Sequence, residues 1–99
     1  MAKGPSLLEN QVAAYRESLG LTQEQLARIV EVSRQTIVSL EGGQYNPSTV
    51  LALRLALLFG VTVNDVFLLP GSAVADLRER YRTLTRPDSG QAKAGNPSG

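Results

Sequence analysis

The 99-residue sequence contains no cysteine and no histidine. Without thiol and imidazole side chains, the chain cannot form a disulfide, a metal site built from these ligands, a cysteine nucleophile or a Ser-His-Asp triad. The acidic residues Glu24, Glu31 and Glu41 occupy ordinary positions in the predicted helices, so they give little support for acid–base catalysis. We therefore expect neither an enzyme nor a bound cofactor or metal.

Long apolar runs and an excess of either charge are also missing. The longest continuous apolar stretch, Leu55 to Phe59, is far shorter than the ~18 residues of a membrane span, and residues 1–5 lack a signal-peptide core. Ten Lys and Arg face nine Asp and Glu, which gives a net charge of +1 and by itself indicates no partner. The part up to residue 70 is slightly acidic, and the basic excess follows it. These features predict a small cytoplasmic protein with no membrane association.

Aromatic residues make up only 5% of the chain, whereas 42% of the residues are hydrophobic. A core of Leu, Val, Ile and Ala favours helices, and strand patterns are nearly absent because Asn64 and Asp65 interrupt the alternation from Val61 to Leu69. A chain this short buries only about 60–65% of its unfolded surface, which is enough for one compact core. The predicted fold class is all-α.

Capping patterns mark the starts of the central helices. Thr22 with Gln25 predicts a helix from about residue 23, Ser33 predicts the next one, and Thr62 begins a third pattern. Ser48 and Gly60 bracket a fourth helix at about 49–59.

Apolar spacing predicts the two outer helices. The first covers about 7–19, ended by Gly20, and an additional amphipathic helix covers about 73–84. The residues from 85 to 99 are rich in Pro, Gly, Ser and Asn, so we expect a mobile tail.

Two short helices joined by a tight turn have the layout of a helix-turn-helix. From Leu21 to Glu41 the sequence reads LTQEQLARIVEVSRQTIVSLE and resembles the phage-repressor (Cro and lambda-repressor-like, Xre) family. The resemblance covers most of residues 7–69 and includes the later segments YNPS and FGV. It implies a five-helix domain over 7–69 whose third helix, about 34–42, enters the DNA major groove. An arm (1–6), a linker with the additional helix (70–84) and the tail complete the organisation.

The outer face of the third helix carries side chains suited to reading bases, because Gln pairs with adenine, Arg with guanine and Ser with either. The alternative is that this face is only exposed to solvent and binds no ligand. Position by position, the resemblance implies contacts to base edges or to the DNA backbone for one set of residues: Gln23, Ser33, Arg34, Gln35, Thr36, Ser39, Gln44, Tyr45 and Asn46. It also implies that Arg16 and Glu41 form a structural ion pair between the first and third helices.

Two features depart from the family pattern. Glu31 stands in the turn where Gly is usual, and a left-handed conformation there would cost roughly 1 kcal/mol. The fourth helix has a second apolar face, and the additional helix has an apolar stripe. Either intramolecular docking or a dimer interface would cover these residues: Val50, Leu53, Leu57, Val74, Leu77, Tyr81 and Leu84.

The leading hypothesis is a sequence-specific regulator of transcription, a repressor that binds double-stranded DNA as a homodimer on two half-sites. The alternative is a protein-interaction module or antitoxin component that uses the fourth helix and the C-terminal helix to bind a protein partner.

Overall fold

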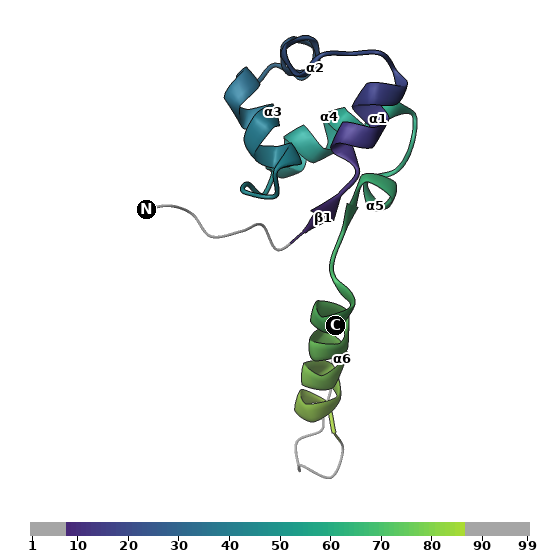
Figure 1. Ribbon diagram of the computed structural model, residues 1–99. Helices are drawn as coiled ribbons and strands as arrows, with labels where there is room; N and C mark the ends of the chain where they lie inside the picture. The colour runs from purple at the N-terminus through teal and green to yellow at the C-terminus, as the bar shows by residue number, and fades with distance from the viewer. Residues whose placement is uncertain (1–7, 87–99) are drawn as a thin grey trace. The chain divides into compact units, whose positions relative to one another are not determined.

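The computed structural model describes residues 8–86, which fall into two compact units divided between Leu69 and Pro70. Each unit is described by itself (Figure 1). Residues 1–7 and 87–99 lie outside the described residues, and with them the expectations for the arm and for most of the tail. The elements follow in chain order: β1 (Glu9–Asn10), α1 (Val12–Ser18), α2 (Gln23–Val30), α3 (Arg34–Glu41), α4 (Thr49–Phe59), α5 (Val63–Val66), β2 (Phe67–Leu68) and α6 (Gly71–Leu84).

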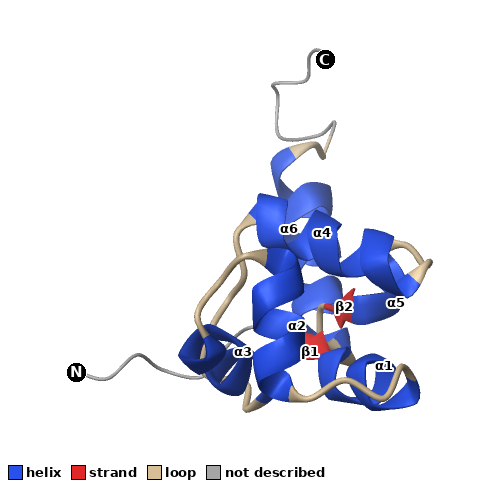
Figure 2. Ribbon diagram, turned by 90° about the horizontal axis from the view of Figure 1, so that it is seen from above, coloured by secondary structure: helices blue, strands red, loops and turns tan. Residues whose placement is uncertain are grey.

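The first helix begins later than the sequence predicts. Residues 9 and 10 are extended and pair antiparallel with residues 67 and 68 in a two-stranded ladder, seen in red in Figure 2. The N–H of Gln11 donates to the carbonyl of Val66 at 2.9 Å, and the side chain of Asn10 accepts from the N–H of Val12 at 3.1 Å. The prediction of a helix from residue 7 was wrong because backbone bonds to a distant segment hold the chain extended. The fold is nevertheless all-α.

The predicted helix starts are confirmed by their caps. Thr22 accepts from the N–H of Gln25 at 3.0 Å, while the Gln25 side chain accepts from the N–H of Thr22 at 2.8 Å. The hydroxyl oxygens of Ser33 and Ser48 cap α3 and α4, each accepting one backbone N–H at 3.1 Å. At the other end of α4, Gly60 takes a φ of 73°, as a C-terminal glycine should.

The short helix α5 is held by a reciprocal contact between Thr62 and Asp65. The Asp65 carboxylate accepts from the backbone N–H and from the hydroxyl of Thr62, both at 2.9 Å. These two bonds, the backbone one first, lower the pKa of Asp65 below its ordinary value.

The core of the first unit is entirely aliphatic except for one phenylalanine. Tyr15 of α1 and Phe59 of α4 stack at its edge, with ring centroids 5.1 Å apart. This packing helps to hold α1 and α4 together. The buried residues are Val12, Leu26, Ala27, Val30, Ile37, Leu40, Leu51, Ala52, Leu55, Ala56, Val66 and Phe67.

The second unit contains α6, which begins two residues before the predicted start at 73 and has no buried residue. Arg80 pairs with Asp76 at 3.0 Å, and Arg82 with Glu79 at 2.9 Å, across one turn of the helix. Within residues 8–86, no helix combines the length and the apolar character that crossing a membrane requires.

Candidate nucleic-acid interface

Helices α2 and α3 are joined by a tight turn that starts at Glu31. This residue takes a left-handed conformation, with φ 65° and ψ 48°, and it is the one non-glycine residue among the described ones with a positive φ. The N–H of Val32 then bonds the carbonyl of Ala27 at 3.0 Å, which ends α2. The left-handed conformation, which the sequence left open, is therefore present at Glu31. The turn sets the direction in which α3 leaves α2.

Helix α3 separates an apolar inner face from a polar outer face. Ile37 and Leu40 are buried in the core, whereas Arg34 and Gln35 are exposed. The Gln35 amide donates to the hydroxyl of Ser39 at 3.3 Å, one turn further along. Arg34, Gln35 and Ser39 thus offer donors and acceptors that can reach a ligand outside the helix.

The N-terminal end of α3 is rich in hydroxyl groups. Ser33 and Thr36 share a hydrogen bond of 2.9 Å between their hydroxyl oxygens, and Ser33 also caps the backbone of Thr36. Ser33 is exposed, and Thr36 is partly buried. Hydroxyls and backbone N–H groups at a helix N-terminus suit an anionic oxygen.

The loop after α3 holds three more predicted residues. Gln44 and Asn46 are exposed, and the N–H of Gln44 bonds the carbonyl of Ser39 at 2.9 Å, which ties the loop to the helix end. Tyr45 is partly buried against the core. The loop therefore continues the polar surface of α3 through two exposed amide side chains.

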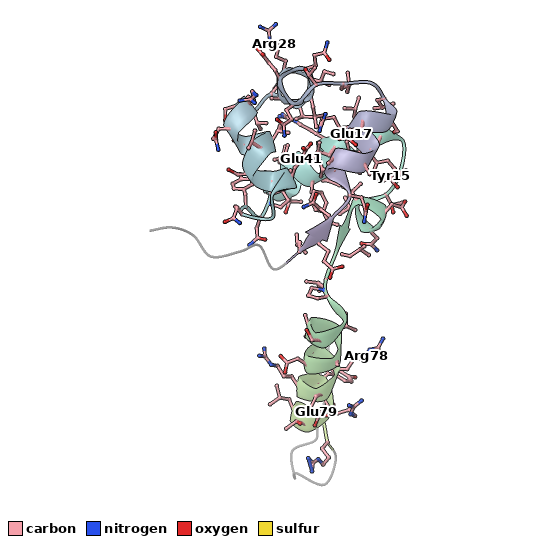
Figure 3. All side chains as sticks on the ribbon, in the orientation of Figure 1. Tyr15, Glu17, Arg28, Glu41, Arg78 and Glu79 are labelled. Atoms are coloured by element: carbon pink, nitrogen blue, oxygen red, sulfur yellow. The ribbon has the colours of Figure 1, made fainter. Side chains whose placement is uncertain are left out.

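Arg16 and Glu41 make a bidentate ion pair that joins α1 to the end of α3. The Arg16 Nε donates to one carboxylate oxygen at 2.7 Å and an Nη donates to the other at 3.2 Å. The side chains are only 13% and 8% exposed. Glu41 lies on the side of α3 that faces α1 (Figure 3). The hydrogen bond to Glu41 raises the pKa of Arg16 above its ordinary value.

Gln23 joins this ion pair, a role that the sequence did not indicate. Its amide donates to the Glu41 carboxylate at 3.0 Å, while the second Nη of Arg16 donates to the carbonyl of Leu21 at 2.8 Å. The network therefore links α1, the start of α2 and the end of α3. The Gln23 side chain lies at the N-terminus of α2, where a phosphate contact was expected, but its amide also helps to position α3.

Two further contacts could not be predicted from the sequence. The Asn10 amide donates to the carbonyl of Leu40 at 3.0 Å, which caps the C-terminal end of α3. Arg54 of α4 donates to the carbonyl of Val30 at 3.1 Å and lies 3.6 Å from the Glu31 carboxylate. Both contacts join residues more than twenty positions apart, so no local pattern signals them.

The apolar faces predicted on α4 and α6 are exposed in the structure. Leu57 is 82% exposed and lines, with Ile29 and Leu58, a shallow groove of about 290 Å³ beside the Glu31–Arg54 pair. The other exposed members of these faces are Val50, Leu53, Val74, Leu77, Tyr81 and Leu84.

A capped helix, a left-handed turn and a second capped helix with a polar outer face together define a helix-turn-helix protein. Residues 12–66 match the Helix-turn-helix family, which is more than half of the chain. The chain belongs to the Xre/Cro-like helix-turn-helix family of transcriptional regulators.

Several relatives share this segment. An uncharacterised HTH-type transcriptional regulator of Methanocaldococcus jannaschii is 46% identical over 61 residues, which are 62% of this chain and 92% of the relative. Another, from Bacillus subtilis, is 40% identical over 60 residues, covering 61% of this chain and 91% of the relative. The similarity therefore spans nearly the whole of these short regulators.

Solved structures resemble the same fold. The restriction-modification controller protein C.AhdI from Aeromonas hydrophila is 31% identical with a TM-score of 0.51, covering 55% of this chain and 82% of that protein. The clp gene regulator ClgR from Corynebacterium glutamicum is 26% identical with a TM-score of 0.52, covering 77% of this chain and 80% of the other.

Proposed function

We propose that this protein is a sequence-specific repressor of transcription that places α3 in the major groove of double-stranded DNA. The observation that carries the proposal is the outer face of α3. Arg34 and Gln35 are exposed there, while the opposite face is buried and the end of the helix is anchored through Glu41. A rigidly held helix with a polar outer face is what reading base edges requires.

In this arrangement the side chains of α3 divide the work by their chemistry. Gln35 forms a bidentate pair with adenine, Arg34 does so with guanine, and Ser39 contacts either base. The hydroxyls of Ser33 and Thr36 contact the DNA backbone. Gln23, Gln44, Tyr45 and Asn46 flank the helix and bind phosphates or nearby backbone.

The charge distribution supports recognition by hydrogen bonds more than by bulk electrostatics. The part of the chain that contains α2 and α3 is slightly acidic in sequence, and nonspecific affinity depends on the number of phosphates that Lys and Arg neutralise. We therefore expect weak binding to random DNA, a modest dependence on salt, and affinity concentrated on one preferred sequence.

A single small module reads few base pairs, so we propose that the protein acts as a homodimer on two half-sites about one helical turn apart. No cofactor is needed for this activity. The protein would act in the cytoplasm, where bacterial and archaeal DNA lies.

A second candidate function rests on the exposed apolar side chains of α4. Leu53 is 55% and Leu57 is 82% exposed, and surfaces of this kind mark protein interaction sites. A protein-interaction module or antitoxin component would use this face, together with α6, to bind a partner.

Selection of bound sequences from random duplex DNA, combined with a measurement of mass in solution, tests these alternatives. Enrichment of a palindromic site by a dimer supports the proposed function. A variant with Arg34→Ala and Gln35→Ala is the matched control, since both residues are exposed and their loss should abolish enrichment without unfolding the domain. A folded wild-type protein that enriches no sequence overturns DNA reading and favours the interaction module.

A further inference from the structure

Helix α6 carries an apolar stripe that no other part of the described chain buries. It covers 14 residues, none of which is buried, and its large apolar side chains are between 37% and 80% exposed. Helices of this length are marginal in water unless an apolar face is covered by a partner. We therefore expect another apolar surface to pack against the stripe of α6.

The spacing of the stripe indicates that this surface is a second helix. Val74, Leu77, Tyr81 and Leu84 follow one another at intervals of three, four and three residues. This is the a and d spacing of a coiled coil, with Val74 and Tyr81 at a and the two leucines at d. In a parallel coiled coil, a β-branched residue such as Val74 at a with leucine at d favours two helices over three or four.

The charges that flank the stripe favour the parallel orientation. Arg78 and Arg80 take the e and g positions, where residues of two paired helices meet. In a parallel pair, Arg78 faces Ala73 and Arg80 faces Thr85 of the other copy. In an antiparallel pair, each arginine would face its own counterpart, which is repulsive.

The acidic residues of α6 lie away from the proposed contact. Asp76 and Glu79 take the outer c and f positions, and they already pair with Arg80 and Arg82. Arg80 and Arg82 therefore have carboxylate partners on α6 itself and do not require an acidic partner protein.

We propose that α6 pairs in parallel and in register with α6 of a second copy of this chain. This inference rests on the proposed function, a DNA-binding homodimer, and assigns the contact between the two copies to α6. Four a and d positions span only two heptads, so the dimer should be weak and depend on concentration. Two half-sites on one DNA would then strengthen it by holding both copies together.

Sedimentation of the full chain over a range of concentrations tests the pairing. Leu77→Lys should raise the dimer dissociation constant by at least about tenfold, because it places a charge at a d position. Ala75→Lys adds the same charge at an outer position of the same helix and should leave the dissociation constant unchanged. A wild-type protein that stays monomeric at every concentration, or a dimer that Leu57→Lys disrupts and Leu77→Lys does not, overturns the proposal.

The absence of cysteine allows a direct test of orientation. In a parallel pair, Val74→Cys lies beside its counterpart, so mild oxidation should give a covalent dimer, whereas Ala75→Cys should give little. If Val74→Cys fails to cross-link alone but does so when mixed with Leu84→Cys, the helices are antiparallel and the proposal is wrong.

These measurements need no DNA, so they separate the pairing from the proposed function. A monomer that still enriches one DNA sequence would overturn the pairing alone. A dimer cross-linked through α6 that enriches no sequence would overturn DNA reading alone.

Discussion

The guanidinium of Arg54 lies 3.6 Å from the carboxylate of Glu31 at the turn of the helix-turn-helix. The same Nη donates to the carbonyl of Val30, so the cation also satisfies the C-terminal end of α2. The residue that replaces the usual glycine thus has an arginine from α4 beside it. Because both side chains are largely exposed, the ion pair itself contributes little.

Replacing Glu31 by glycine should stabilise the protein. The left-handed backbone at Glu31 is strained, and Glu31→Gly should raise the free energy of unfolding by about 0.5–1 kcal/mol after the weak ion pair is lost. The same change inside α2, Glu24→Gly, should lower it by about 1 kcal/mol. Urea unfolding followed by circular dichroism measures both. If the two variants are destabilised equally, the turn stores no strain.

Glu41→Ala should lower stability and DNA affinity together. It leaves the partly buried Arg16 cation without its bidentate partner and with only the exposed Glu17 carboxylate, 3.6 Å away, beside it. Losing that partner costs on the order of 3–5 kcal/mol and releases the end of α3. Glu24→Ala removes an exposed carboxylate, 3.9 Å from Arg28, and should change stability by less than about 0.5 kcal/mol. Thermal unfolding and DNA titration are needed on each variant. A Glu41→Ala protein with full stability and no DNA binding would show that Glu41 contacts DNA.

Gln35→Ala should weaken binding to the preferred site while leaving nonspecific binding nearly unchanged. The expected loss is about 1–3 kcal/mol for each base contact removed. Gln11→Ala, an exposed glutamine before α1, serves as the control and should have no effect on either. Titrations on the selected site and on random DNA at one salt concentration make the comparison. Equal losses on both DNAs would argue against base reading.

The start of α5 should make stability depend on acid. The pKa of Asp65 is lowered by its hydrogen bonds to Thr62, so the folded state binds this proton less readily than the unfolded state does. The stabilisation is full above the ordinary pKa of 3.8 and is lost as the pH falls through the lower folded value. Asp65→Ala should therefore be less stable than wild type at neutral pH, with a gap that narrows in acid.

Urea unfolding at a series of pH values measures this gap. Asn64→Ala changes an exposed neighbour that does not titrate, so its difference from wild type should not vary with pH. A gap for Asp65→Ala that stays constant down to strongly acid pH would show that the carboxylate does not stabilise the helix by its charge.

Most of the helices could be predicted from the sequence because their signals are local. A cap joins residues three positions apart, as Ser48 and Leu51 do, and the span of α4 was predicted to the residue at both ends. The turn at Glu31 was likewise expected, whereas its left-handed backbone is known only from the structure. The strands at residues 9 and 67 were missed because two-residue segments carry no periodicity.

The candidate interface was predictable in part. The polar face of α3 follows from helical spacing, which places Gln35 opposite Ile37 and Leu40. The engagement of Gln23 with Glu41 was not predictable from spacing, because it depends on how close the start of α2 comes to the end of α3. Which of the predicted residues touch DNA stays a prediction.

The sequence by itself determined the helix boundaries marked by caps, the polar face of α3 and the exclusion of cysteine and histidine chemistry, because these depend on residue identity and short-range spacing. Only the tertiary structure decided what holds α3 in place. Arg16, Gln23 and Glu41 come from three helices, and Asn10 and Arg54 reach carbonyls more than twenty residues away. Such bonds form only after the apolar core has brought distant segments together, so no local pattern encodes them.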